Sequence, residues 1–203
     1  MCNLLSLGVL RNLRGGAAFD AARFGSSLDG LDLQQRIAAT RALGKSDQAA
    51  LWEVCQGNET SAEDFVPAHV PLGREVIHYG KNSLPLFSHF QKRFARAAEA
   101  DTVYGYNWNG IGWTTAGPGY FIGHHDADMG HAFGLDYYHL PPSDAVLPAG
   151  WPAMRANEIG LQRFIYAEMI DYMRRVTDGV TIGRAWRKGK VTDNYFVLVR
   201  GGV

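Results

Sequence analysis

The chain has 203 residues, of which 46% are hydrophobic and 20% are charged, and these globular values exclude wholesale disorder and a fibrous architecture. Its 20 basic and 20 acidic side chains cancel, so it lacks the positive field of most nucleic-acid-binding proteins, and we expect no nucleic-acid partner. The two cysteines, Cys2 and Cys55, match no disulfide or metal-ligand pattern, which favours a reducing, cytoplasmic location.

We expect no membrane span, because no apolar stretch approaches the roughly 20 residues that crossing a bilayer requires. The first nineteen residues lack acidic side chains and contain several leucines with two arginines. We interpret them as a first amphipathic element of the fold, since a secretory signal would carry its basic residues before the apolar run. The length favours a single domain spanning residues 1–203.

Residues 1–100 are predicted to be mainly helical. Residues 15–30 are rich in Gly, Ala and Ser and predict a loop. Residues 31–43 and 46–57 predict two short helices, with Gly44 ending the first and Ser46 capping the second. The polar, proline-flanked segment 58–71 predicts a surface connection.

The segment that follows Ser83 predicts the clearest helix of the chain. Serine can cap a helix, and Pro85 is tolerated in a first turn. Phenylalanines at positions 87, 90 and 94 recur at helical spacing, while Lys92 and Arg93 fall largely on the other side. We therefore expect an amphipathic helix that buries a phenylalanine stripe.

Residues 101–203 change to the two-residue period of strands. Tyr104, Tyr106 and Trp108 alternate with small or polar residues, and Asn109-Gly110 is typical of a tight hairpin turn. Further alternations run through residues 120–124 and 133–139. No crossover helix separates these segments, which disfavours a parallel sheet. We expect a curled antiparallel sheet.

Residues 161–176 fit either a helix or a strand, because both periods place apolar residues on one side. Thr177-Asp178-Gly179 and the strand-like run 180–186 favour a hairpin, so we prefer the strand. Residues 195–200 then close the sheet after a polar turn through residues 188–190.

The C-terminal run resembles the end of small bacterial lipocalin-like (calycin) domains, over about forty residues. The resemblance lies in Ile165-Tyr166, Asp171–Val176, Ile182-Gly183 and Tyr195–Arg200. It implies an antiparallel barrel that holds an apolar ligand. Gly112-Trp113-Thr114 departs from the Gly-x-Trp-x-Gly motif of one such family. The predicted fold class is therefore α+β, with a helical N-terminal half packed on a curled sheet that forms a lipocalin-like β-barrel.

One face of the predicted strands is unusually small or polar. Either it lines a cavity, or its glycines mark places where the sheet must bend sharply. The residues of this face are Gly105, Asn107, Gly123, Gly134, Asp136, Ala167, Gly183 and Ala185.

The first functional hypothesis is a protein that binds a small, partly apolar molecule. Aromatic residues with polar tips suit the wall of such a pocket, and the candidates are Tyr106, Trp108, Tyr137, Tyr166 and Trp186. The alternative is a cofactor-independent isomerase, cyclase or hydrolase in the same cavity. A carboxylate or imidazole would then transfer the proton, and the candidates are Asp136, His139, Glu168 and Asp171. Whether the chain is an enzyme stays open at this point.

The densest group of metal-ligand types is the segment 124–131, where His124, Asp126 and His131 could coordinate zinc or iron. A structural turn is favoured over a metal site, because no further ligand is placed by the sequence to complete the set. No nucleophile-elbow or phosphate-loop signature is present, and we expect no cofactor. The oligomeric state stays open, with a homodimer as one alternative.

Asp171 lies beside Arg174 and Arg175, a combination that exists either as an ion pair on the surface or as a buried acid–base device. The surface pair is the preferred interpretation, because exposed ion pairs are common.

Overall fold

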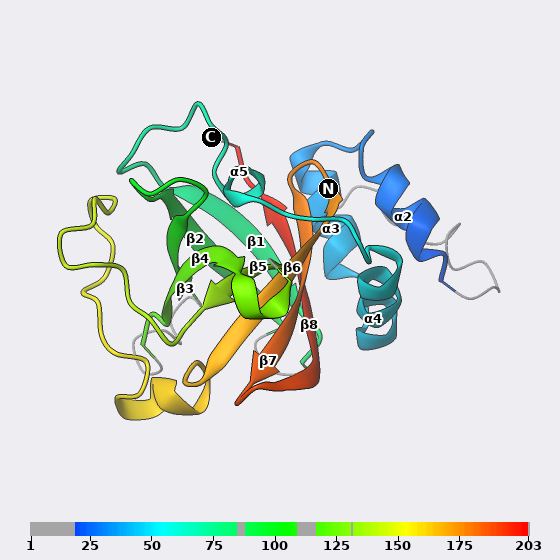
Figure 1. The fold of residues 1–203 in the computed structure, drawn as a ribbon. Helices are drawn as coiled ribbons and strands as arrows, with labels where there is room; N and C mark the ends of the chain where they lie inside the picture. The colour runs from blue at the N-terminus through cyan, green and yellow to red at the C-terminus, as the bar shows by residue number, and fades with distance from the viewer. Residues whose placement is uncertain (1–18, 85–87, 109–116, 131, 203) are drawn as a thin grey trace.

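The computed structural model describes residues 19–84, 88–108, 117–130 and 132–202, and its main feature is a closed antiparallel β-barrel of eight strands (Figure 1). Each strand pairs with the next along the chain, and β1 pairs with β8 to close the ring. The strands are β1 (Val76–Asn82), β2 (His89–Arg96), β3 (Val103–Trp108), β4 (Tyr120–Asp126), β5 (Ala132–Asp136), β6 (Met169–Thr177), β7 (Val180–Arg187) and β8 (Lys190–Arg200). The prediction of a curled antiparallel sheet with helices beside it is confirmed.

The last two hairpins form where turn chemistry predicts them. β6 turns into β7 at Asp178 and Gly179, where Gly179 has a φ of 69°. β7 turns into β8 through Lys188 and Gly189, whose φ values of 53° and 69° are both left-handed. Two left-handed residues are the geometry of the tight turn that matches the twist of antiparallel strands. The turns Asn109-Gly110 and the segment Gly112-Trp113-Thr114 lie outside the described residues.

The helix predicted after Ser83 is wrong, because the described part of that segment forms strand β2. Phe90 and Phe94 are four residues apart, a spacing that puts two side chains on one side of a helix and also of a strand. In the barrel Phe90, Lys92 and Phe94 share the inner face, whereas Arg93 points outward to Glu75. The strand β1, which precedes this segment, was not predicted either, so the barrel takes two strands from the first hundred residues.

The prediction for residues 161–176 is correct in its second half. Residues 160–164 form a short 3-10 helix, η3 (Gly160–Phe164), and β6 begins only at Met169. Glu168 has a φ of 58° at the entry to the strand. Its carbonyl accepts a hydrogen bond from the Lys188 amide at 2.9 Å, so this corner is tied to the β7–β8 turn.

The N-terminal helices are α2 (Ala21–Ser27), α3 (Leu33–Arg41), α4 (Lys45–Val54) and the short α5 (Ala62–Phe65). α2 replaces a predicted loop, and the Asp20 side chain caps it by accepting from the Arg23 amide at 3.0 Å. α3 and α4 confirm the predicted helical pair. The cap of α4 differs from the prediction, because the helix begins after Gly44 and Ser46 lies in its first turn. None of the described helices is long and apolar enough to cross a lipid bilayer.

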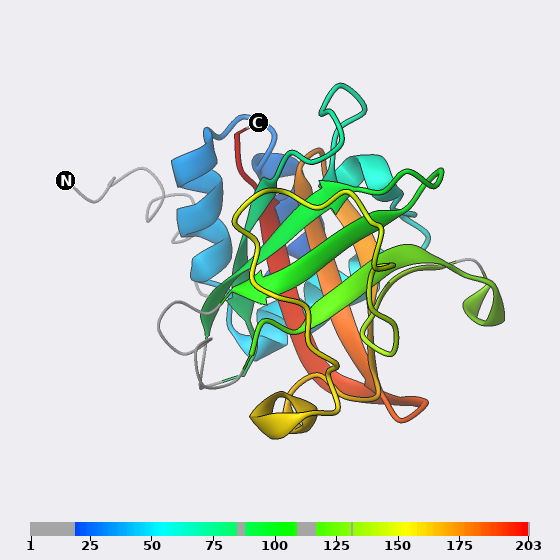
Figure 2. The ribbon, with the colours of Figure 1, turned by 90° about the vertical axis from the view of Figure 1, so that its left-hand side faces the viewer.

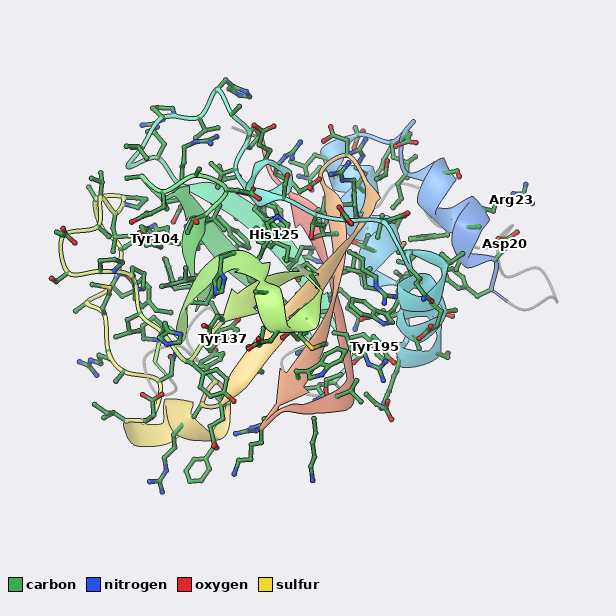
Figure 3. The ribbon with its side chains drawn as sticks, viewed as in Figure 1. Asp20, Arg23, Tyr104, His125, Tyr137 and Tyr195 are labelled. Carbon is green, nitrogen blue, oxygen red and sulfur yellow. The ribbon has the colours of Figure 1, made fainter. Side chains whose placement is uncertain are left out.

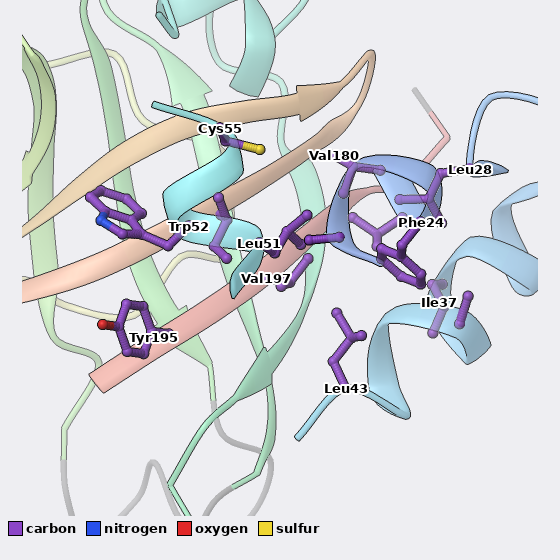
Figure 4. Close-up of a cluster of buried hydrophobic side chains, with 14 of the residues drawn as sticks. Phe24, Leu28, Ile37, Leu43, Leu51, Trp52, Cys55, Val180, Tyr195 and Val197 are labelled. Carbon is purple, nitrogen blue, oxygen red and sulfur yellow. The ribbon is translucent and has the colours of Figure 1, made fainter. Parts of the chain in front are cut away.

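Helices α2, α3 and α4 cover one side of the barrel, over the outer faces of β6, β7 and β8 (Figures 1 and 2). Phe24, Leu28 and Leu51 of the helices are fully buried against Val180 and Val197 of the strands (Figure 4). This layer is separate from the core inside the barrel. Among the described residues the helices span 21–65, so the predicted helical N-terminal half ends before the first strand, at residue 76 rather than at residue 100.

Helix α5 closes one end of the barrel. The Phe65 ring is fully buried and stacks on Phe94 and Phe133, with centroids 5.0 and 5.2 Å apart. His78 of β1 lies beside it, and its Nε2 is 2.9 Å from the Phe65 carbonyl oxygen. This end of the lumen is filled by aromatic side chains, which leaves the opposite end for a cavity.

Three strand glycines, two of them from the small-residue face, are each covered by a phenylalanine on the neighbouring strand. A Cβ atom on these glycines would lie 2.2–2.5 Å from the nearest atom of the covering ring. The cross-strand pairs are Gly80 with Phe90, Gly105 with Phe121, and Gly183 with Phe196. A third cause, the close approach of a neighbouring ring, accounts for Gly105 and Gly183, in addition to the predicted alternatives of a cavity lining and a sharp bend. Asn107 and Ala185, by contrast, line a cavity.

Candidate functional site

A cavity of about 300 Å³ is lined by residues of η3, of the segment that follows it and of the β7–β8 hairpin. These elements lie at the end of the barrel opposite α5 (Figure 1). Its apolar wall comes from the inner faces of the strands and from the segment between η3 and β6. The apolar and aromatic residues of the wall are Leu84, Phe90, Tyr137, Phe164, Ile165, Tyr166, Met169, Ala185, Tyr195 and Phe196. A volume of this size suits one small ligand.

A cluster of four polar side chains crosses the lumen at the inner end of this cavity. Lys92 comes from β2, Asn107 from β3, Tyr137 from the residue after β5, and Asp171 from β6. Each is at most 4% exposed. The Lys92 Nζ donates to Asn107 Oδ1 at 2.9 Å and to Asp171 Oδ2 at 3.0 Å, and it also donates to the Tyr137 hydroxyl. The cluster therefore links opposite walls of the barrel by a buried ion pair.

The donors of this cluster are all used within it or by the backbone. The three N–H groups of a Lys92 ammonium match its three acceptors. Asn107 Nδ2 donates to the Tyr137 hydroxyl at 2.8 Å and to the Gly119 carbonyl at 3.2 Å. The Tyr137 hydroxyl is 3.3 Å from Asp171 Oδ2 and donates to it. Each polar hydrogen of the cluster thus has a protein acceptor.

One acceptor remains open. Asp171 Oδ1 accepts no hydrogen bond from any residue that the structure describes. It is also not among the described side-chain atoms that are both sealed from solvent and unpartnered. Because Asp171 lines the cavity, Oδ1 is the polar atom that the cluster presents to a ligand.

Burial dominates the electrostatics of the cluster. Burial lowers the pKa of Lys92, and the carboxylate of Asp171 opposes this shift. Burial raises the pKa of Tyr137 well above its ordinary value, so Tyr137 is a neutral phenol at physiological pH. The rings of Phe121 and Phe196 lie 5.1 and 4.9 Å from the Lys92 Nζ and stabilise its charge. The hydrogen-bond pattern fits an ammonium–carboxylate pair beside a neutral phenol.

Two of the five predicted ligand-contacting aromatics lie at this cavity. The Tyr137 and Tyr166 rings stack with centroids 5.6 Å apart and an interplanar angle of 8°. The Nδ2 of Asn157, a residue of the long segment between β5 and β6, donates to the carbonyls of Tyr120 and Tyr137 at 2.8 Å each. Tyr137 is among the side chains labelled in Figure 3. The backbone that carries Tyr137 is thus held from two sides.

The other three aromatics lie on the outer surface of the barrel. Tyr106 packs against Trp151, with ring centroids 5.0 Å apart. Trp108 lies under the guanidinium of Arg93 at 5.3 Å. Trp186 meets the ring of Tyr172 edge-on at 5.0 Å. None of these three lines the cavity, because odd and even positions of a strand point to opposite faces.

Of the four predicted catalytic candidates, the structure places only Asp171 at the cavity. Asp136 accepts from the Tyr138 amide and lies 2.6 Å from His139 Nδ1, on the outer face of β5. Glu168 forms an exposed ion pair with Lys188 at 3.2 Å. Proton transfer inside the barrel would therefore fall to Asp171 among these four.

The preferred interpretation of Asp171 as a surface partner of Arg174 or Arg175 is wrong. Asp171 is 3% exposed and pairs with Lys92. Arg174 instead lies 3.8 Å from the centroid of the Trp52 ring, and Arg175 pairs with Asp64 at 2.8 Å. Successive side chains of a strand alternate between its two faces, so residues three positions apart, such as Asp171 and Arg174, lie on opposite faces of the sheet.

The predicted metal ligands do not gather into a set within the described residues. His124 Nε2 is 3.7 Å from Asp136 Oδ2, and Asp126 accepts from the Tyr172 hydroxyl at 2.5 Å. No group of three or more His, Cys, Asp or Glu side chains in the described part of the chain is placed to hold a metal ion. His131 lies outside that part.

Lys92 and Asn107 belong to the site, but the sequence did not predict either of them as a functional residue. Lys92 was assigned to the polar side of a helix. The alternation Phe90, Lys92, Phe94 was the available signal, because a strand places all three on one face. Asn107 was recognised as part of the small or polar face but was not given a partner.

Comparison with protein-family models, with curated proteins and with solved structures found no match to this chain.

Proposed function

We propose that this protein binds one small, partly apolar molecule inside its barrel. The observation that carries the proposal is the cavity of about 300 Å³, which has mostly apolar walls and a few convergent polar groups at its inner end. Pockets of this composition are typical of small-molecule sites. An eight-stranded closed barrel has room for one such ligand, as lipocalin-like barrels do.

The arrangement of the two cores supports this proposal. The helices pack on the outer face of the barrel, and α5 fills only one end of the lumen. Within the described residues, the rest of the lumen is left to the cavity. The polar cluster also costs stability in an apolar lumen, because burying two charges is unfavourable even when they pair. A ligand that uses the cluster accounts for its presence.

The test is ligand binding by the purified protein and by a cavity-filling variant. Ala185 of β7 lines the cavity and is 7% exposed. We expect Ala185→Phe to abolish saturable binding of the neutral dye Nile red, because the ring occupies the ligand space. The matched control is Ala22→Phe on the exposed side of α2, which should bind the dye like the unmodified protein. Native mass spectrometry would identify a co-purified ligand.

Two results would reject the binding proposal. One is that the unmodified protein neither retains a ligand nor binds the dye in a saturable manner. The other is that Ala185→Phe binds the dye as well as the control while melting at the same temperature, since the cavity would then not be the binding site.

A second candidate function is proton transfer by Asp171, supported by its open oxygen in an apolar cavity beside Tyr137. We propose that Asp171 Oδ1 would take a proton from a carbon next to a ketone and return it. NMR of 2-acetylnaphthalene in heavy water tests this step, because catalysis exchanges its methyl hydrogens for deuterium. Equal exchange with and without the protein would exclude this activity for that substrate.

A further inference from the structure

The polar end of the cavity has an unusual balance of donors and acceptors. Lys92, Asn107 and Tyr137 donate their hydrogen bonds to each other, to Asp171 and to the Gly119 carbonyl. Asp171 Oδ1 receives none from the described residues. The cluster therefore offers an incoming ligand one charged acceptor and no free donor, and the other polar residues that line the cavity, such as Arg187 and Asn194, do not belong to it.

We infer that the ligand is an uncharged apolar molecule that carries a hydroxyl group, an alcohol or a phenol, and that this hydroxyl donates to Asp171 Oδ1. This inference rests on the proposed binding function and adds the chemical class of the ligand. A hydroxyl supplies the one missing hydrogen bond, and a bond to an ionised acceptor is stronger than one between neutral groups.

Charge excludes the two other common classes of amphiphile. A carboxylate at this position would meet the Asp171 carboxylate and find no free donor within the cluster. An ammonium group would reach the open oxygen only close to the Lys92 ammonium, which is 3.0 Å from the other oxygen of the same carboxylate. Because the Lys92–Asp171 pair is already neutral as a unit, bringing a further charge into this lumen carries a desolvation cost without compensation.

The walls suit a flat ring system. Tyr166, Phe90 and Phe196 line the space beside the cluster, and the ring of Tyr166 lies parallel to that of Tyr137. Aromatic rings stack favourably in an offset arrangement on such walls. A bicyclic aromatic alcohol therefore makes a suitable probe.

The experiment compares four probes with one ring system, by calorimetric titration near neutral pH, where carboxylates and amines are charged and a phenol is not. The probes are 2-naphthol, 2-methoxynaphthalene, 2-naphthoate and 2-naphthylmethylammonium. We expect 2-naphthol to bind about tenfold or more tightly than each of the others, because it alone is a neutral donor.

The variant Lys92→Met/Asp171→Leu removes both charges and replaces them with apolar side chains of similar shape, a change that buried ion pairs often tolerate. It should lose the preference for 2-naphthol over 2-methoxynaphthalene and still bind the latter. The matched control Lys188→Met/Glu168→Leu makes the same chemical change at an exposed ion pair and should keep the preference.

Different outcomes overturn the two proposals. If no probe binds, the proposed binding function fails. If 2-naphthoate binds as tightly as 2-naphthol, the cavity is a binding site but the hydroxyl inference is wrong. Loss of that naphthoate binding in Arg187→Gln would then place the anion at Arg187, which also lines the cavity. If the preference for 2-naphthol survives in Lys92→Met/Asp171→Leu, the hydroxyl does not bind Asp171.

Discussion

Asp171 and Lys92 show how a single position in a strand decides the role of a charged residue. In the sequence Asp171 has arginines close by, but in the barrel its nearest cation is Lys92 on a strand across the lumen, with Nζ and Oδ2 3.0 Å apart. Both side chains are nearly inaccessible to solvent. A pair in such surroundings depends on both partners, because either charge alone would stay buried and unpaired.

We expect Asp171→Asn to destabilise the protein by about 3–5 kcal/mol, because it leaves the Lys92 ammonium uncompensated in the lumen. Urea denaturation measures this loss. Lys92→Met/Asp171→Leu should recover most of it, since neither charge is then buried. A loss of no more than about 1 kcal/mol in Asp171→Asn is the magnitude of an exposed pair and would contradict the buried one.

At the scale of elements, the barrel is shaped by glycine–phenylalanine pairs between neighbouring strands. Gly183 of β7 pairs with Phe196 of β8, and a Cβ on the glycine would lie 2.2 Å from the ring. The ring covers the glycine and lies between the cavity and the strand. Such pairs bend a sheet and fill the lumen at the same time.

We expect Gly183→Leu to cost about 1–3 kcal/mol or more, because the new side chain overpacks the ring of Phe196. Thermal melts compared with the unmodified protein measure the cost. Adding Phe196→Ala should restore part of the stability, since it removes the atoms with which the leucine collides. A melting temperature unchanged by Gly183→Leu would mean that the ring moves aside freely and that this face is open.

At the scale of the whole molecule, the barrel has one filled end and one end with a cavity. The filled end contains His78, which is 1% exposed and has Phe65 and Phe94 rings on it. The pKa of His78 is lowered to about 3, chiefly by burial and also by the charge of Arg200, while the hydrogen bond with the Phe65 carbonyl opposes the shift. The folded protein therefore holds a neutral imidazole where the unfolded chain binds a proton.

This arrangement predicts how stability falls in acid. His78 ordinarily titrates at 6.5, so above that pH its contribution is fully present. Below that pH the unfolded chain binds a proton on His78 and the folded protein does not. The free energy of unfolding therefore falls by about 1.4 kcal/mol per pH unit until the pH approaches the pKa of His78 in the folded protein. Urea denaturation at several pH values between about 4 and 7 measures this slope.

The control variant His78→Gln cannot titrate in this range but keeps an N–H donor for the Phe65 carbonyl, the partner of His78 Nε2 at 2.9 Å. Its stability should fall less steeply in acid than that of the unmodified protein. His124, whose pKa is raised chiefly by its interaction with Asp136, is present in both proteins and cancels in the comparison. Equal slopes would show that His78 takes up its proton equally in the folded and the unfolded protein, and that burial does not lower its pKa.

What the sequence by itself determined is local. The Asp-Gly and Lys-Gly turns, the helices α3 and α4 and the alternation of β3, β7 and β8 follow from the backbone preferences of a few adjacent residues. The spacing of Phe90 and Phe94 fits both a helix and a strand, and only the tertiary structure decided between them. The neighbouring strands of the barrel provide the apolar surroundings into which the inner face of β2 packs. It also decided the site. Lys92, Asn107, Tyr137 and Asp171 meet across a lumen that exists only when β1 pairs with β8, and no spacing in the sequence encodes a contact between opposite walls of a closed barrel.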